Sequence, residues 1–222
     1  MNSNKLHNIV IVGGGAGGLE LATRLGKRLG KKKKAVITLV DANRTHFWKP
    51  LLHEVAAGSI NAFEDELSYL AQAKWNNFHY IPGRMNRLDR KNKTIGLEAI
   101  TSDNKDVVPP RTLNYDTLVI SVGSTANDFN TTGAKEHCLF LDNRSQAEQI
   151  HTTLINHYLR AQASGNSLSK LKVAIIGAGA TGVELAAELH NAAIELENYG
   201  LNAIKHKNLE VSLIEGSERI LP

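Results

Sequence analysis

A gapless internal repeat constrains this chain of 222 residues more than any other feature. The segment GGGAGGLELATRL, which begins at Gly13, aligns with GAGATGVELAAEL, which begins at Gly177, and eight of the thirteen positions are identical. The offset of 164 residues is far longer than the roughly 20–50 residues that separate the units of a solenoid. The sequence therefore predicts two copies of one folded unit in a single chain.

Each copy begins with glycines in the spacing G-x-G-x-x-G. They are Gly13, Gly15 and Gly18 in the first copy and Gly177, Gly179 and Gly182 in the second. In this motif the first glycine permits a tight turn after a strand, the second lets a pyrophosphate approach the backbone, and the third lets helix and strand pack closely. The following helix offers free N–H groups and a positive dipole end to the phosphates. Both copies are therefore predicted to bind a dinucleotide.

The sequence around each motif predicts the strands and helices that the motif requires. The apolar runs Asn8–Val12 and Leu171–Ile176 precede the two motifs and are typical of buried parallel strands. A helix is predicted after each motif, and in the first copy it is marked by apolar residues at spacings of three and four. These residues are Leu19, Ala22, Leu25 and Leu29.

A second strand in each copy ends at an acidic residue. Ala35–Val40 leads into Asp41, and Leu209–Ile214 leads into Glu215. A carboxylate at this place can accept hydrogen bonds from ribose hydroxyls. Both acids follow their motif at more than the usual distance of about 20 residues, and the lysine loop 31–34 accounts for the excess in the first copy.

The region between the copies changes pattern. Trp75–Tyr80 is predicted to form a third parallel strand, residues 83–115 a small antiparallel meander, Tyr115–Val122 a buried strand and Asp142–Arg160 a helix. We place the domain boundary near Leu141. The predicted fold is α/β, with two Rossmann-like dinucleotide-binding domains at residues 1–141 and 142–222, the first of which contains the meander.

Composition narrows the function classes. The net charge of +4 is mild, and the run Lys31–Lys34 is interpreted as a solvated loop, with attraction to anionic lipid as the alternative. Nucleic-acid binding has no support because no aromatic residues are interleaved with these lysines. Cys138 is the single cysteine, which excludes an internal disulfide or CxxC motif, and we interpret it as a structural thiol. No apolar run approaches the roughly 18 residues that span a bilayer.

The double motif, the meander and the segment YDTLVISVGS (115–124) resemble the two-dinucleotide flavoproteins of the pyridine nucleotide-disulfide oxidoreductase superfamily. That resemblance covers essentially the whole chain and implies FAD at the first motif and NAD(P)H at the second. Disulfide reductases of the superfamily carry a cysteine pair after the second strand, whereas this chain has HFWKPLLHEVAAG (46–58) there. Together with LDNRSQA and GATGVELAAELHNA, this segment resembles bacterial type II NADH dehydrogenases, which pass electrons from NADH through FAD to a membrane quinone without pumping protons.

The resemblance assigns roles to individual residues. It implies that Glu184 lies beside the nicotinamide and the flavin as the catalytic residue, although an acid in a first helical turn is also favoured by the helix dipole alone. Glu215 favours NADH over NADPH because its carboxylate would repel a ribose phosphate. The remaining residues assigned to the flavin are Lys49, Pro50 and Leu51 beside the isoalloxazine ring, Met85 at the adenine, and Gly123 and Ser124 over the FAD.

Three aromatic or imidazole side chains near residue 50 have two interpretations each. His46 and His53 are predicted to be hydrogen-bonding residues rather than metal ligands, and no metal site is predicted. Trp48 is interpreted either as a neighbour of the flavin or as an aromatic residue packed on its own domain.

The second copy contains fewer elements than the motif requires. A mononucleotide-binding half needs three parallel strands, and only seven residues follow Glu215. We therefore expect an incomplete second domain and an FAD domain without its closing segment, in a soluble cytoplasmic fragment that is inactive by itself. For the full-length family the resemblance implies a peripheral enzyme at the cytoplasmic face of the cell membrane. It also implies membrane contact through the absent C-terminal part and a possible homodimer.

Two other functions remain open at this point. One is a soluble NAD(P)H-dependent flavin reductase that delivers electrons to a small redox protein. The other is a non-catalytic nucleotide-binding redox sensor. Quinone reduction would discriminate against the first, and steady consumption of NADH would discriminate against the second.

Overall fold

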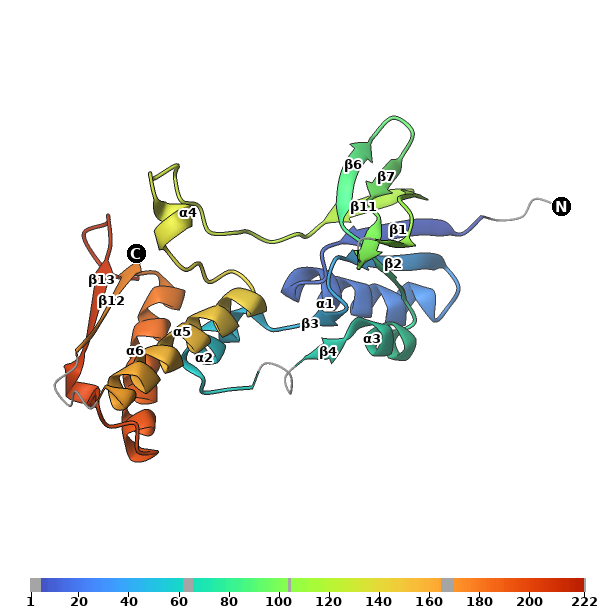
Figure 1. Cartoon of the computed structure of the whole chain (residues 1–222). Helices are drawn as coiled ribbons and strands as arrows, with labels where there is room; N and C mark the ends of the chain where they lie inside the picture. The colour runs from blue at the N-terminus through green and yellow to red at the C-terminus, as the bar shows by residue number, and fades with distance from the viewer. Residues whose placement is uncertain (1–4, 62–65, 104, 165–169, 222) are drawn as a thin grey trace. The chain divides into compact units, whose positions relative to one another are not determined.

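The computed structural model describes residues 5–61, 66–103, 105–164 and 170–221, and Figure 1 shows its elements. The chain forms two compact units: unit 1 comprises Met1–Trp48 and Asp65–Ser124, and unit 2 comprises Lys49–Glu64 and Thr125–Pro222. The predicted boundary at Leu141 concerns the cofactor-binding domains rather than these units, and it stays a prediction.

Unit 1 is built on a parallel sheet with strand order β11-β1-β2-β5. Its strands are β1 (His7–Val12), β2 (Ala35–Asp41), β5 (His79–Pro82) and β11 (Thr117–Ile120). The buried strand predicted over Tyr115–Val122 is therefore wrong in its burial, since β11 is shorter, lies at an edge of the sheet and has no buried residue. Both faces of this sheet are covered, with helices on one side and the meander on the other (Figure 1). Because neighbouring side chains of a strand point to opposite faces, Ile11 packs toward the helices while Val10 and Val12 pack toward the meander. This double burial explains the continuous apolar runs in the sequence.

The helices of unit 1 are α1 (Ala16–Leu25), which continues as the π-helix η1 (Gly26–Gly30), and α3 (Tyr69–Asn76). The strand predicted over Trp75–Tyr80 is wrong at its beginning, since Trp75 is the penultimate residue of α3 and β5 starts at His79. Ser68 caps α3 by accepting a hydrogen bond from the Ala71 N–H, and Asn77 ends it in the left-handed conformation. The aromatic content of this segment indicated a strand, but Trp75 is 70 % exposed.

The predicted antiparallel meander is confirmed. A three-stranded sheet of order β10-β7-β6 joins β6 (Met85–Asp89), β7 (Thr94–Leu97) and β10 (Arg111–Asn114). A separate antiparallel pair joins β8 (Ile100–Ser102) and β9 (Lys105–Val108), and another joins β3 (Thr45–His46) and β4 (Leu67–Ser68). Ile95 and Leu97 of β7 are completely or nearly completely buried, and they pack against the central sheet.

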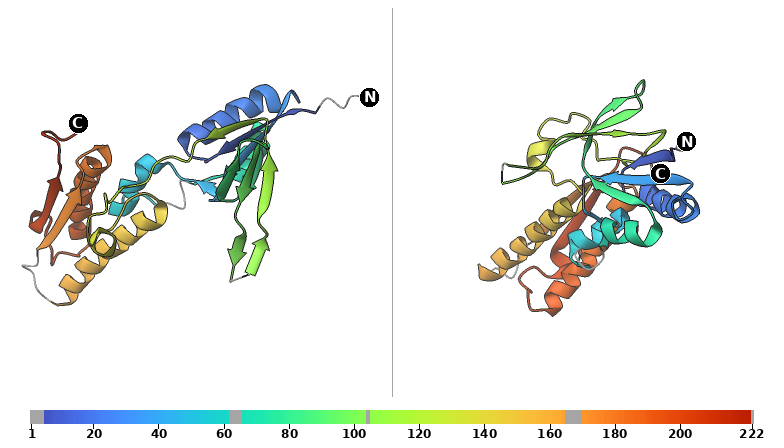
Figure 2. Two further views of the ribbon diagram at one scale, coloured as in Figure 1. Left: turned by 90° about the horizontal axis from the view of Figure 1, so that it is seen from above. Right: turned by 90° about the vertical axis from the view of Figure 1, so that its right-hand side faces the viewer.

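Unit 2 contains the second copy of the repeat. Its strands β12 (Leu171–Ile176) and β13 (Leu209–Ile214) are parallel and pair along their whole length. The helices are α2 (Leu52–Ala57), α4 (Ala134–His137), α5 (Arg144–Ala163) and α6 (Ala180–Asn198), with short 3-10 turns η2 (Lys49–Leu51) and η3 (His206–Asn208). Helix α6 packs on both strands, and α2 packs against α5 and α6 (Figure 2). The predicted helix near 142–160 is confirmed as α5, which Asn143 caps through the Gln146 N–H.

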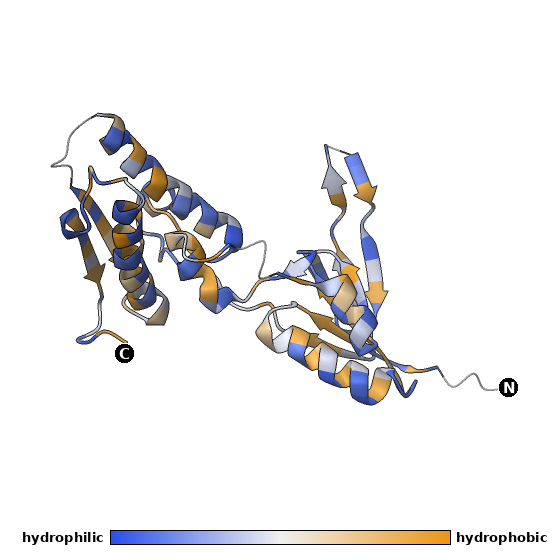
Figure 3. Ribbon diagram, turned by 90° about the horizontal axis from the view of Figure 1, so that it is seen from below, coloured by the Kyte–Doolittle hydropathy of each residue, from blue (hydrophilic) through white to orange (hydrophobic). Residues whose placement is uncertain are grey.

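The helices of both units carry alternating hydrophilic and hydrophobic bands (Figure 3), as expected for helices that bury one face. In unit 2 the buried positions of α6 include Leu185, Leu189 and Ala193. Cys138, interpreted from the sequence as a structural thiol, is exposed, so that interpretation was wrong. Within the described ranges, no helix combines the length and the apolar character that crossing a bilayer requires.

Candidate functional site

The two glycine turns have the same backbone geometry. Gly13 and Gly177 have φ angles of +100° and +99°, which side-chain-bearing residues rarely adopt. Each turn is hydrogen-bonded to the second strand of its own copy of the repeat. The Gly13 N–H donates to the Val40 carbonyl and the Gly177 N–H donates to the Ile214 carbonyl, both at 2.8 Å. The internal repeat seen in the sequence is therefore a repeat in structure as well.

The second and third glycines of each motif have different surroundings. A Cβ added at Gly15 or Gly179 would have no atom within 4 Å. A Cβ at Gly18 would lie 1.8 Å from the Gly13 carbonyl oxygen, and one at Gly182 would lie 2.0 Å from the Gly177 oxygen. The third glycine is thus required by packing inside the unit, whereas the second borders open space.

Helices α1 and α6 begin at these open positions. Gly15 and Gly179 are the N-cap residues, and neither helix has a side-chain cap from the described residues. By contrast, α3 and α5 are capped by Ser68 and Asn143. The first N–H groups of a helix have no partner within the helix, so α1 and α6 can offer theirs to an anion.

The acid after each second strand holds the turn of its own motif. Asp41 Oδ2 accepts a hydrogen bond from the Gly14 N–H at 2.6 Å, and Glu215 Oε2 accepts one from the Ala178 N–H at 2.8 Å. Gly14 and Ala178 are equivalent positions of the repeat. Each carboxylate oxygen has two lone pairs, so both acids keep acceptor sites for a ribose. The sequence indicated the ribose role only, and the role in the turn became visible in the structure.

Glu215 Oε1 also accepts hydrogen bonds from the N–H groups of Gly216 and Ser217. These bonds, with that from Ala178 as the largest, lower the pKa of Glu215. A lowered pKa in the folded state stabilises the protein above the unfolded pKa, and this stabilisation disappears as the pH falls through the folded pKa. We therefore expect acid unfolding of the wild type to be steeper below about pH 4.5 than that of Glu215→Gln, measured by circular dichroism against pH. Identical acid profiles of the two proteins would contradict this expectation.

The carbonyl of Gly14 is the centre of a buried polar cluster in unit 1. It accepts hydrogen bonds from the Tyr69 hydroxyl at 2.7 Å and from His46 Nδ1 at 2.9 Å. Burial, and then the charge of Asp41, raise the pKa of Tyr69, and the same causes raise the pKa of Tyr80 to about 12. The prediction that His46 is a hydrogen-bonding residue is confirmed. Trp48 lies edge-on to the His46 ring and is about half exposed.

A cavity of about 360 Å³ in unit 2 brings together residues that are far apart in the sequence. Lys49 and Pro50, predicted beside the flavin ring, line it together with Glu184, predicted beside the nicotinamide. Leu51 does not line it, and Leu52 does. The other lining residues are Leu141, Ala180 and Thr181. Glu184 is the fifth residue of α6 and lies just beyond its first turn, so the sequence placed it one turn too early. The cavity lies at the N-terminal end of that helix, because Ala180 and Thr181 also line it.

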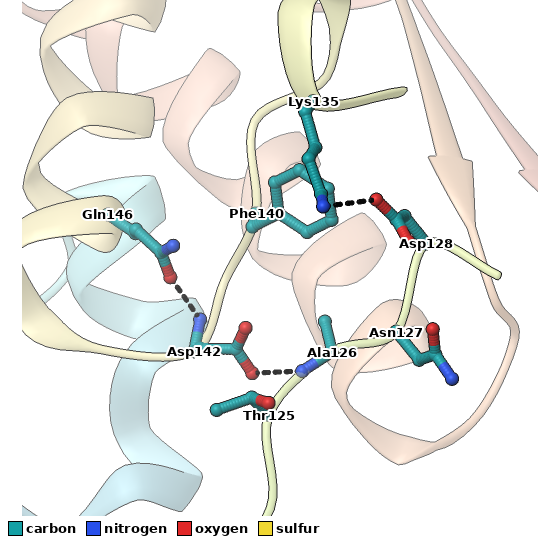
Figure 4. Close-up of a pocket in the computed structure, with 8 residues that line it drawn as sticks. All are labelled: Thr125, Ala126, Asn127, Asp128, Lys135, Phe140, Asp142 and Gln146. Carbon is teal, nitrogen blue, oxygen red and sulfur yellow. Dashed lines mark hydrogen bonds and ion pairs between the residues drawn. The ribbon is translucent and has the colours of Figure 1, made fainter. Parts of the chain in front are cut away.

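A second cavity, of about 610 Å³, is lined by the segment that leads into α5 (Figure 4). Asp142 organises this segment. Its Oδ1 accepts a hydrogen bond from the Ala126 N–H at 2.8 Å, its own N–H donates to Gln146 Oε1 at 2.7 Å, and Lys49 Nζ lies 3.5 Å from Oδ1. The sequence did not single out Asp142, because an acidic residue just before a helix is usually an ordinary helix cap.

The remaining predicted residues lie in unit 1. Met85 opens β6 and packs against the core on the meander side of the sheet. Gly123, with φ +73°, follows β11. The Ser121 carbonyl of the same segment lies close to Gly13, since a Cβ at Gly13 would be 2.2 Å from it. Ser121 and Val122 therefore lie beside the first glycine turn. The roles predicted for Met85, Gly123 and Ser124 stay predictions.

Two parallel β-α-β units, each with a glycine turn, a helix without a side-chain cap among the described residues and a terminal acid, define an α/β protein with a repeated Rossmann-like unit. The chain belongs to the pyridine nucleotide-disulphide oxidoreductase family, whose model matches residues 7–222.

The names of individual relatives are more specific than the description of the family. The chain is 43 % identical over 233 aligned residues to the type II NADH:quinone oxidoreductase of Haemophilus influenzae, covering 98 % of this chain and 52 % of the relative. It is 28 % identical to the enzyme of the same name from Staphylococcus epidermidis, covering 96 % and 50 %. The structure of NDH2 from Plasmodium falciparum in complex with NADH matches with a TM-score of 0.80 at 24 % identity, covering 98 % and 43 %, which supports the predicted fold. The chain spans about half the length of the curated relatives it matches.

Proposed function

We propose that the protein is an FAD-dependent oxidoreductase that accepts hydride from NADH and passes electrons to a membrane quinone, as the names of its relatives suggest. The observation that carries this proposal is the cavity of unit 2. It gathers Lys49 and Pro50, which the resemblance assigned to the flavin, and Glu184, which the resemblance assigned to the nicotinamide and the flavin. Residues expected at one reaction centre thus lie around one space.

The geometry of the two turns fits the two cofactors. The open space beside Gly15 and Gly179 is where a side chain would exclude a pyrophosphate, and the helix N-termini next to them lack side-chain caps from the described residues. Gly13, Gly15, Gly18 and Asp41 would hold FAD, and Gly177, Gly179, Gly182 and Glu215 would hold NADH. When bound, the flavin supplies a hydride acceptor and the nicotinamide a hydride donor.

The side chains of the cavity would bind and orient rather than carry out the redox chemistry. Lys49 lies 3.5 Å from Asp142 and offers a positive charge at the rim, while Pro50 and Leu52 contribute apolar walls. The Glu184 side chain is half exposed and lines the same space, so it can contact a bound nicotinamide and hold a proton there.

Glu215 is proposed to select NADH over NADPH. Its carboxylate stands at the end of β13, and at neutral pH its negative charge would repel a ribose phosphate. We expect Glu215→Gln to raise KM for NADH and to lower the ratio of kcat/KM for NADH over NADPH by about tenfold. The measurement is steady-state kinetics with both nucleotides, with Glu210→Gln as the control because Glu210 pairs with Lys170 on the surface. An unchanged ratio would remove the ribose role.

The proposed activity is tested with FAD-loaded protein extended to the full length of its curated relatives, because this chain spans about half of that length. NADH should bleach the flavin absorbance, and addition of a water-soluble quinone should then sustain consumption of NADH. Turnover with a small redox protein but not with quinone would point to a soluble reductase, and binding of both nucleotides without bleaching would point to a redox sensor.

We further propose that the protein acts at the cytoplasmic face of the cell membrane, where a membrane quinone is accessible. For the full-length family the resemblance also implies contact with the membrane through the C-terminal part that this chain lacks, and a possible homodimer. Flotation of the full-length protein with quinone-containing vesicles tests the first expectation, and sedimentation equilibrium tests the second.

A further inference from the structure

His53 of α2 faces Glu184 of α6. Its Nδ1 atom lies 3.4 Å from Glu184 Oε2, while its Nε2 atom lies 3.9 Å from Glu54 Oε1. The His53 side chain is only 11 % exposed. Its Nδ1 atom is buried and has no hydrogen-bond partner among the residues that the structure describes. A buried polar atom without a partner is uncommon and requires a specific reason.

The two neighbouring carboxylates, those of Glu54 and Glu184, differ in their distance from the His53 ring nitrogens. The distance of 3.9 Å to Glu54 clearly exceeds that of a hydrogen bond, whereas the distance of 3.4 Å from His53 Nδ1 to Glu184 is only slightly longer than one. Glu184 lines the cavity of unit 2 and His53 does not. His53 is therefore placed to act on the cavity through Glu184.

The helix that carries His53 is held firmly in unit 2. Leu52, Val55 and Ala56 of α2 are buried against α5 and α6. Just after α2, the Ser59 hydroxyl donates a hydrogen bond of 2.6 Å to Glu188, one helical turn beyond Glu184 on α6. These contacts fix the spacing between α2 and α6, so the imidazole stays opposite Glu184.

We propose that His53 is a positioning residue, whose Nδ1–H donates to the Glu184 carboxylate and holds it toward the cavity. This inference rests on the proposed function, because it gives Glu184 the place beside the nicotinamide. Without the imidazole, the half-exposed carboxylate of Glu184 can swing into solvent. A fixed carboxylate would hold the nicotinamide in the orientation that hydride transfer needs, whereas a swinging one would still allow NADH to bind.

The first arm of the test needs no cofactor. Ring nitrogen chemical shifts of His53, measured by NMR on the protein alone, should show the proton on Nδ1 in the neutral imidazole. In Glu184→Ala this preference should disappear. A neutral ring protonated on Nε2 in the wild type, or a tautomer that is unaffected by Glu184→Ala, would contradict the contact.

The second arm measures flavin reduction by NADH in stopped flow, with FAD-loaded protein extended to the full length of its curated relatives. His53→Leu should lower the limiting rate by about tenfold or more, with a much smaller change in the concentration of NADH at half-maximal rate. His53→Asn should restore much of this rate, because the asparagine amide places a donor near the position of Nδ1. His151→Leu is the matched control, since His151 in α5 also has a buried Nδ1 atom without a hydrogen-bond partner among the described residues. His151→Leu should keep nearly the wild-type rate.

The outcomes distinguish failure of the positioning role of His53 from failure of the proposed function. If His53→Leu, His53→Asn and His151→Leu slow the reaction equally, His53 is only a packing residue and the proposal fails. A wild-type rate in His53→Leu also overturns it. If wild-type protein with bound FAD is not reduced by NADH at all, the proposed function fails, and the NMR arm still decides whether His53 donates to Glu184.

Discussion

Gly15→Val is expected to abolish retention of FAD while leaving unit 1 folded. Gly15 has φ −61° and extended ψ, which valine readily adopts, and a Cβ there would meet no protein atom within 4 Å. The valine side chain would instead fill the space through which a pyrophosphate reaches the N-terminus of α1. Overpacking a tight site costs about 1–3 kcal/mol or more, and the phosphates would also lose the helix N–H groups.

The measurement is the flavin-to-protein ratio after gel filtration, accompanied by thermal unfolding. Gly179→Val is the matched control, because it makes the same change at the equivalent position of the second motif. It should retain FAD, while the bound flavin should no longer be reduced by NADH. Wild-type flavin content in Gly15→Val would show that the first motif does not bind the FAD pyrophosphate. Loss of FAD in both variants would show that the assignment of the two motifs to two cofactors is wrong.

The architecture could be predicted from the sequence where local pattern and global fold agree. The apolar run before the first motif became a buried parallel strand because both faces of that sheet are covered. The run before the second motif also became a parallel strand, but its predicted burial was wrong, since every second residue of β12 is exposed. The two acids stand at strand ends as predicted. The segment around Trp75 was mispredicted because aromatic residues favour strands. In the structure Trp75 belongs to helix α3, which begins after the Ser68 cap and ends at Asn77 in the left-handed conformation.

The candidate site was predicted less completely than the fold. The glycine positions follow from the motif because backbone geometry dictates them, and the resemblance supplied Lys49, Pro50 and Glu184. Asp142 and the contact between His53 and Glu184 depend on how α2 and α5 pack around α6. The contact between His53 and Glu184 joins residues more than 100 positions apart, and the ion pair of Lys49 with Asp142 also joins two distant segments. No periodicity in a single sequence reports such contacts.

Substitution of the third glycine of each motif should lower the stability of the fold, whereas substitution of the second should leave the fold intact and impair cofactor binding. Gly18→Ala should destabilise the protein by about 1–3 kcal/mol or more, because the new Cβ would lie 1.8 Å from the Gly13 carbonyl oxygen and the backbone of the turn would have to shift. Gly182→Ala should do the same in unit 2, where the distance to the Gly177 oxygen is 2.0 Å. The expected loss of stability is informative, because replacing glycine by alanine inside a helix ordinarily stabilises a protein by about 1 kcal/mol.

Gly17→Ala provides the control at the neighbouring position of α1. A Cβ at Gly17 would meet only the Ser121 hydroxyl, at the ordinary contact distance of 3.4 Å, so this variant should be as stable as the wild type or more stable. Chemical denaturation monitored by circular dichroism, without added nucleotides, measures the effect on folding separately from any effect on binding. If Gly18→Ala unfolds at the same denaturant concentration as Gly17→Ala, then helix and strand do not pack closely at the third glycine. The motif would in that case constrain nucleotide binding alone and not the fold of the unit that carries it.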